Sequence, residues 1–321
     1  MWFLTEKRSS ETRYPAFVLG SCEEAFQRNL NGSPLSDLSI RSDSMLHREF
    51  MPWTLKTLST SRITKLSISC ARVSKPTWSA FLRIVALPHL EDLEISSDPF
   101  FWDYKSSHPP FADLQHFFAR HPGIRTLCWE GVERFQTPPT IEEPILPSLS
   151  SVKACSTNIV SLLQMHQSYP DTLTRLKSLT LSTGRQSHAL IYNPFDAALD
   201  HLANFSGKDI ALTLRFICST GMSTWFARHV ALGKENSSLS RLTCVSSLFI
   251  SGGFVVGIET DVKANLPTWL SLFPCLKSVS FVQILYEGLE LLKDEEFLER
   301  IVESCPQIKV IRVGDLSKTY H

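Results

Sequence analysis

The chain lacks a surplus of charge of either sign. Its 321 residues contain 32 Lys and Arg against 32 Asp and Glu, so the formal net charge at pH 7 is zero. Proteins that bind nucleic acids depend on clustered cations that neutralise phosphates. The balance therefore argues against DNA, RNA or an anionic membrane surface as the main partner.

Closely spaced cysteine pairs are also missing. The eight cysteines are spread almost evenly along the chain, without a C-x-x-C pair. Structural zinc sites use such pairs, so we expect no metal site. An even number of cysteines would allow disulfides in a secreted chain. However, several of them, such as Cys275, lie beside repeated apolar positions. We interpret them as reduced thiols, which are typical of the cytoplasm or the nucleus.

The sequence has no apolar run long enough to cross a membrane. Its longest uncharged stretch, residues 242–258, is shorter than the roughly 20 residues that a span requires. The apolar start of the chain, residues 1–4, is too short for a signal peptide. We expect a cytoplasmic or nuclear protein with no membrane partner.

Familiar catalytic motifs are absent as well. The sequence contains no G-x-G-x-x-G, G-x-S-x-G, H-E-x-x-H or D-x-D-x-D-G pattern. Residues 206–209 resemble the end of a P-loop, but Asp209 replaces the hydroxyl residue that would bind magnesium. His116 and His121 lie on or just after one predicted helix, and we interpret them as solvent-facing or helix-end histidines. We expect no enzyme activity and no cofactor.

What the chain does contain is a repeated phrase: an apolar residue, two spacers, a second apolar residue, one spacer and a third apolar residue. Copies start at Leu35, Ile63, Leu90, Ile124, Leu149, Leu176, Val245, Leu276 and Ile308, with a weaker copy at Leu212 and Leu214. The first six copies start 25 to 34 residues apart. Self-similarity at this period is typical of an irregular leucine-rich repeat. Because one unit cannot bury its apolar face alone, the units must stack.

Helices are predicted between the phrases. Apolar residues recur at steps of three and four over residues 78–87, 111–121, 158–169, 195–205, 222–232, 266–273 and 294–305. Prolines two residues before several phrases end these helices. The sequence therefore predicts an α/β leucine-rich-repeat solenoid, a horseshoe with parallel strands on the concave face and helices on the convex face. About nine or ten units would occupy residues 21–316, after an N-terminal segment or truncated repeat (1–20) and before a tail (317–321).

Residues between the apolar positions of a strand face outward. Asp37, Lys65 and Asp92 occupy equivalent positions in the first three phrases, which predicts a row of alternating charges. Glu94, Glu130, Lys153 and Arg215 should share this open face. Paired carboxylates can perform acid–base chemistry, but an open strand face offers no enclosing pocket. We interpret these charges as a surface ladder or as a docking patch for a partner.

The segment at residues 98–110 is rich in aromatic side chains. Trp102 and Tyr104 either fold back onto the core or anchor a partner, since aromatic residues dominate binding hot spots. Our hypothesis is that a protein partner docks on the N-terminal half of the open face. Its site would comprise Lys65, Asp92, Glu94, Trp102, Tyr104, Glu130 and Lys153.

Residues 88–95 (PHLEDLEI), 274–279 (PCLKSV) and 305–308 (CPQI) carry a resemblance to a known family. Over roughly residues 15–316, the chain resembles the repeat region of fungal-type F-box/leucine-rich-repeat proteins. The resemblance implies that the repeats hold a protein substrate, while an F-box binds the small adaptor of a cullin ubiquitin ligase. Residues 1–20 show no F-box-like pattern, so an F-box would have been lost or would lie upstream of Met1. The alternative is a stand-alone leucine-rich-repeat scaffold or inhibitor unconnected to ubiquitin ligation.

Overall fold

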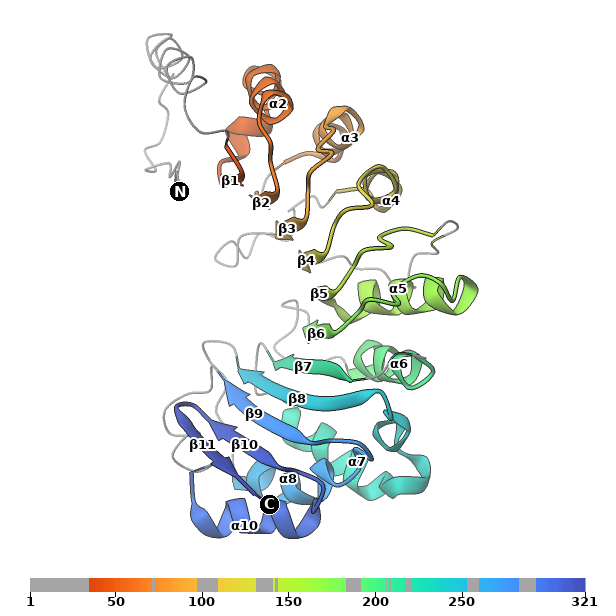
Figure 1. Cartoon of the computed structure of the whole chain (residues 1–321), viewed down its shortest axis with the longest axis vertical. Coiled ribbons are helices and arrows are strands. Elements are labelled where there is room, and N and C mark those ends of the chain that lie inside the picture. The colour runs from red at the N-terminus through yellow and green to blue at the C-terminus, as the bar shows by residue number, and fades with distance from the viewer. Residues whose placement is uncertain are drawn as a thin grey trace. The chain divides into compact units, whose positions relative to one another are not determined.

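The computed structural model describes residues 35–70, 73–96, 109–130, 141, 144–182, 192–205, 207, 209–216, 221–252, 260–282 and 293–320. The chain forms two compact units, Met1–Ile124 and Arg125–His321. In both units, strands alternate with helices along the chain, and the helices lie along one side of the strands (Figure 1).

In its described part, the first unit contains three parallel strands paired in chain order: β1 (Asp37–Ile40), β2 (Lys65–Ser69) and β3 (Asp92–Ser96). Its helical elements are η1 (Asp43–Leu46), α2 (Met51–Thr60), α3 (Lys75–Ile84) and α4 (Phe111–Arg120). The apolar pattern predicted α3 and α4, but it gave no sign of η1 or α2.

Among the residues that the structure describes, the second unit contains seven parallel strands paired in chain order: β4 (Thr126–Glu130), β5 (Ser151–Cys155), β6 (Ser178–Ser182), β7 (Ile210–Phe216), β8 (Val245–Gly252), β9 (Ser278–Val282) and β10 (Val310–Val313). An eighth strand, β11 (Leu316–Thr319), pairs antiparallel with β10. It includes residues 317–319, which the sequence analysis left in a tail. The helical elements are α5 (Ser156–Ser168), α6 (Tyr192–Ala203), α7 (Met222–Asn236), η2 (Ser238–Arg241), α8 (Thr260–Leu270) and α10 (Glu295–Ser304).

This arrangement confirms the predicted α/β class, with parallel strands in chain order alternating with helices. The described strands do not close on themselves. Residues 144–150, between β4 and β5, are neither helix nor strand.

The repeated phrase forms the core of both units. From Ile63 to Val313, every apolar residue of the phrase is at most 4 % exposed. The first copy differs, because Ile40 is buried whereas Leu35 and Leu38 are only half-buried. No described strand precedes β1. Among the strands that the structure describes, only β2 therefore packs beside this copy.

One pattern of backbone hydrogen bonds, in which a carbonyl accepts two N–H groups, repeats at the start of the strands. The carbonyl of Ser36 accepts hydrogen bonds from the N–H groups of Thr64 and Lys65, at 2.8 and 3.0 Å. The carbonyl of Thr64 accepts from Glu91 and Asp92 in the same way, at 2.8 and 2.9 Å. In the second unit the carbonyls of Arg125, Ser150 and Lys277 each accept two N–H groups from the next repeat. These hydrogen bonds fix the register of each strand against its neighbour, so the outward side chains line up in rows.

The packing of the core yields a first prediction. Leu179 of β6 is 1 % exposed, so Leu179→Asp would bury an unpaired charge. We expect a loss of more than about 4 kcal/mol in the free energy of unfolding, measured by chemical denaturation. The control is Ser178→Asp on the adjacent, half-buried outward position, which should cost far less. Equal stability of the two variants would show that the assignment of inward and outward positions is wrong.

Candidate functional site

Three outward charges of the first unit lie in one row across its strands. Lys65 is in register with Asp37 on one side and with Asp92 on the other, which confirms the predicted equivalence of these positions. Glu94 lies two residues beyond Asp92, and its Oε2 accepts a hydrogen bond from the Ser67 hydroxyl at 3.0 Å. The row carries more carboxylates than cations.

Three outward charges and one hydroxyl of the second unit form a compact cluster, which we call the Glu130 cluster: Glu130, Lys153, Ser182 and Arg215. Oε1 of Glu130 accepts from an Arg215 guanidinium nitrogen at 2.6 Å and from the Ser182 hydroxyl at 3.0 Å. Its Oε2 lies 3.2 Å from Nζ of Lys153. The cluster extends over β4, β5, β6 and β7, so the Arg215 side chain reaches across β6 to meet a carboxylate 85 positions away in sequence.

Two cations surround a single carboxylate in the Glu130 cluster. Burial by itself would raise the pKa of Glu130, but Lys153, Arg215 and the Ser182 hydroxyl together lower it below its usual value. The side chain of Glu130 is 22 % exposed. Glu130 is therefore ionised at neutral pH and held within the molecule, while the cluster as a whole carries an excess positive charge.

The structure thus brings together two of the predicted site residues, Glu130 and Lys153. Lys65, Asp92 and Glu94 belong to the other unit, and Trp102 and Tyr104 lie outside the described residues. Arg215 was assigned to the outward face by its place in the strand, but it was not included in the predicted site. No local signal links it to Glu130, because the contact depends on the register of four successive strands.

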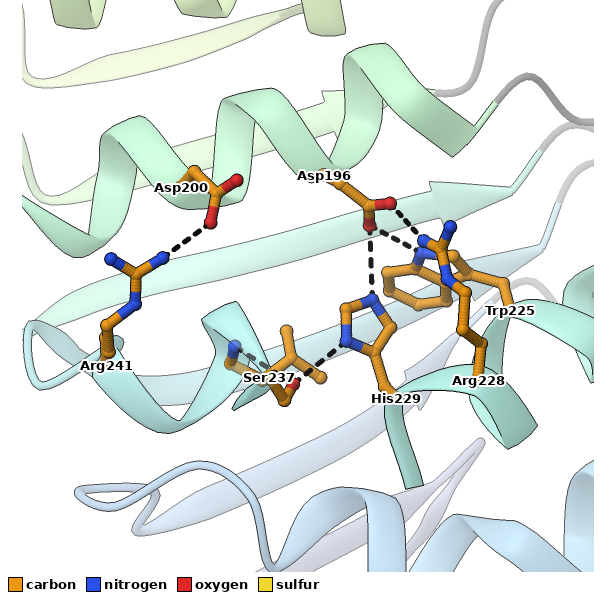
Figure 2. A network of polar contacts seen from close by, with 8 residues as sticks. Asp196, Asp200, Trp225, Arg228, His229, Ser237 and Arg241 are labelled. Atoms are coloured by element: carbon orange, nitrogen blue, oxygen red, sulfur yellow. Dashed lines mark hydrogen bonds and ion pairs between the residues drawn. The ribbon is translucent and has the colours of Figure 1, made fainter. Parts of the chain in front are cut away.

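A second polar network lies on the helical side of the second unit, around Asp196 of α6 (Figure 2). Its carboxylate accepts from Nε1 of Trp225 at 2.8 Å and from Nε2 of His229 at 3.1 Å, and it also pairs with Arg228. Nδ1 of His229 lies 2.9 Å from the Ser237 hydroxyl. Gly233 adopts φ 65° and ψ −172°, a conformation that favours glycine and breaks the end of α7, and Ser237 follows it.

Ser237, His229 and Asp196 have the composition of a nucleophilic triad. However, Ser237 is 1 % exposed and His229 is 2 % exposed, so a substrate cannot reach the hydroxyl. The Ser237 hydroxyl is also the N-cap of η2, where it accepts the N–H of Leu239 at 3.3 Å. The imidazole presents Nδ1 to the serine, whereas the serine-protease arrangement presents Nε2. The network therefore stabilises the contacts of α6 with α7 and η2.

Other reactive groups are engaged in packing. Burial raises the pKa of Cys244 to about 11 and that of Cys305 to about 12, and it also raises that of Cys70. Such thiols are poor nucleophiles. Among the described cysteines, Cys70, Cys244, Cys275 and Cys305 are free thiols. His121 ends α4, as predicted, and is buried: its Nε2 accepts the N–H of Leu87 at 2.9 Å. Burial, with a smaller contribution from Arg120, lowers its pKa, so its ring is neutral.

Within the described ranges, His, Cys, Asp and Glu side chains form no group of three or more that could hold a metal ion. Every helix that the structure describes is too short or too polar to cross a lipid bilayer.

Comparison with protein-family models and with curated protein sequences finds no match to this chain.

A second prediction concerns Asp196 and its neighbour on α6, Asp200. Asp196→Ala would leave the Trp225 N–H and His229 without their acceptor, at a cost of about 2 kcal/mol or more in unfolding free energy. Asp200 pairs with Arg241 at 2.7 Å, but both side chains are more than half exposed. Asp200→Ala should therefore cost less than about 1 kcal/mol. Similar losses for the two variants in urea denaturation would contradict the structural role of the network.

A third prediction uses pH. The pKa of Glu130 is lower in the folded protein than in the unfolded chain, so its contribution to stability is complete above its usual value of 4.5. That contribution is lost as pH falls through the lowered folded pKa. We expect Glu130→Gln to be less stable than the wild type at pH 6, by about 1 kcal/mol or more. The difference should shrink between pH 4.5 and pH 3 in denaturation curves. Glu303→Gln on the exposed side of α10 is the control. If its stability difference from the wild type shrinks equally between pH 4.5 and pH 3, the assignment of the lowered pKa to Glu130 is wrong.

Proposed function

We propose that this protein is a non-catalytic protein–protein interaction module of the leucine-rich-repeat type, and that it binds its partner on the open face of its parallel strands. The observation that carries this proposal is the arrangement of that face. Consecutive strands are held in fixed register, and they present rows of small hydroxyl side chains around charges that are already ordered. A solenoid uses such an extended face for binding.

The hydroxyl rows support a role in binding. In the second unit, one row consists of Thr126, Ser151, Ser178, Ala211, Ser247, Ser278 and Val310. Most of these side chains are half-buried, and Ser278 donates to Ser247 at 2.9 Å. Short side chains let a partner approach the strands closely, and hydroxyls donate or accept hydrogen bonds as the partner requires. A solvent-facing surface that needed no partner would more often carry long charged side chains.

The placement of the reactive groups favours binding over catalysis. The Glu130 carboxylate is held by three partners on an open face, and the Ser237 hydroxyl is buried as a helix cap. General acid–base or nucleophilic catalysis requires a group that both reaches the substrate and is positioned for proton transfer. Among the described residues, neither group meets both requirements.

The resemblance to F-box/leucine-rich-repeat proteins extends the proposal. On this account, the protein acts in the cytoplasm or nucleus as the substrate-recognition part of a ubiquitin ligase and uses no cofactor. Its partner is a protein substrate, and a cullin-ligase adaptor joins if an F-box lies upstream of Met1. A stand-alone scaffold or inhibitor would use the same face without the adaptor.

The test is affinity purification of the tagged whole chain from cells, followed by mass spectrometry. In the blocking variant Thr180→Arg/Thr213→Arg, two bulky cations occupy neighbouring outward positions of β6 and β7. The matched control, Ser168→Arg/Thr268→Arg, places the same groups on exposed positions of α5 and α8. We expect the blocking variant to lose a protein that the wild type and the control both retain, at unchanged melting temperature.

If the blocking variant retains every captured protein, the open face is not the binding surface. Co-purification of a cullin-ligase adaptor with the full-length product of the gene would support the ligase role. A specific partner without the adaptor would favour the stand-alone scaffold.

A further inference from the structure

On the open face of the second unit, we call the row that begins with Thr126 the hydroxyl row. A second row lies beside it, and we call this one the middle row. Residues in register across the strands form it: Cys128, Lys153, Thr180, Thr213, Phe249, Ser280 and Arg312. The described helices pack on the other side of the strands, as Phe195 of α6 does against Phe216 of β7.

Exposure differs between the rows of this face. Ser182 and Ser251, in the row beyond the middle row, are 3 % and 4 % exposed and cannot contact a partner directly. In the middle row Ser280 is also buried, at 4 % exposed, but the Lys153 side chain is 36 % exposed, Phe249 is half-buried and Arg312 is exposed. A partner on this face would therefore meet the middle row and the hydroxyl row.

The charge of the face is positive although the chain as a whole is neutral. Its described strands carry three outward cations, Lys153, Arg215 and Arg312, against one carboxylate, Glu130, so the local balance is 3 − 1 = +2. The Glu130 cluster already displays the preferred ligand of this surface, because Lys153 and Arg215 hold a carboxylate there. Lys153 keeps donor capacity, since an ammonium group has three N–H donors and Glu130 takes one.

The two accessible cations lie near opposite ends of the middle row. Lys153 is on β5 and Arg312 on β10, so five strand spacings separate them. At about 4.8 Å per spacing, the distance between their Cα atoms is about 24 Å along the sheet. An extended peptide covers that distance in about seven residues. Phe249 lies between the two cations in the row and offers an apolar contact.

We infer that the middle row binds an extended acidic segment of a partner protein, with two Asp or Glu side chains about seven residues apart and an apolar residue between them. The acidic side chains pair with Lys153 and Arg312, and the apolar side chain packs on Phe249. The hydroxyl row receives the backbone of the segment. This inference rests on the proposed function and specifies the chemistry of its partner.

The experiment selects a phage-displayed library of random peptides of about 12 residues on the whole chain. The peptides recovered should be enriched in Asp and Glu pairs spaced about six to eight residues apart. Synthetic fluorescent copies are then titrated by anisotropy. Lys153→Gln/Arg312→Gln should weaken their binding about tenfold, and added salt should weaken binding to the wild type. The matched control, Lys234→Gln/Arg300→Gln, removes two exposed cations from α7 and α10 and should bind like the wild type.

Three outcomes decide between the inference and the proposed function. Acidic peptides that lose affinity only in Lys153→Gln/Arg312→Gln support the inference. If the recovered peptides are not acidic and do not bind Thr180→Arg/Thr213→Arg, the inference of an acidic segment is wrong, but the open face is still a binding surface. Peptides that bind every variant equally overturn the inference, and the cellular purification then decides the proposed function independently. Phe249→Ala, which removes no charge, should weaken the binding of acidic peptides that carry the central apolar residue.

Discussion

The parallel register between successive strands is the constraint on which the other features of this protein depend. The register is set by backbone carbonyls that accept two N–H groups from the next repeat, as the carbonyl of Thr64 does from Glu91 and Asp92. It is maintained by three apolar side chains per repeat, which stack on those of the neighbouring strands and are almost fully buried. Buried backbone groups need partners, so a repeat that slipped by one residue would lose both the hydrogen bonds and the burial.

The same register arranges the polar chemistry on the two sides of the strands. On the open side it places Glu130 within reach of Lys153 and Arg215, and it aligns hydroxyl side chains in rows. On the helical side it brings α6 against α7, where Asp196 holds Trp225 and His229. The open side keeps accessible charges, whereas the helical side uses its buried polar groups for packing. This difference is the physical basis for the proposal that a partner binds on the strands.

The sequence predicted the elements that an apolar period can reveal. The strands and most of the helices follow from the repeated phrase and from apolar steps of three and four. Helix α2 was missed because its buried side includes Thr54 and Thr57 as well as Leu58. The two threonine hydroxyls donate to the carbonyls of Met45 and Trp53, at 2.7 and 3.0 Å, so polar residues fill apolar positions at little cost. Strand β11 was missed because its four residues, half of them exposed, depend on β10 for pairing.

By itself, the sequence determined which residues face the core and which face outward, since the alternation of side chains along a strand is local. It thereby placed Glu130, Lys153 and Arg215 on one open face. Only the tertiary structure decided that these three meet, because Arg215 reaches Glu130 across the intervening strands. Likewise, only the packing of α6 on α7 brought Asp196 to His229, 33 residues apart. Contacts of this kind depend on the distance in space between elements that are far apart in the sequence, and a local pattern does not contain that distance.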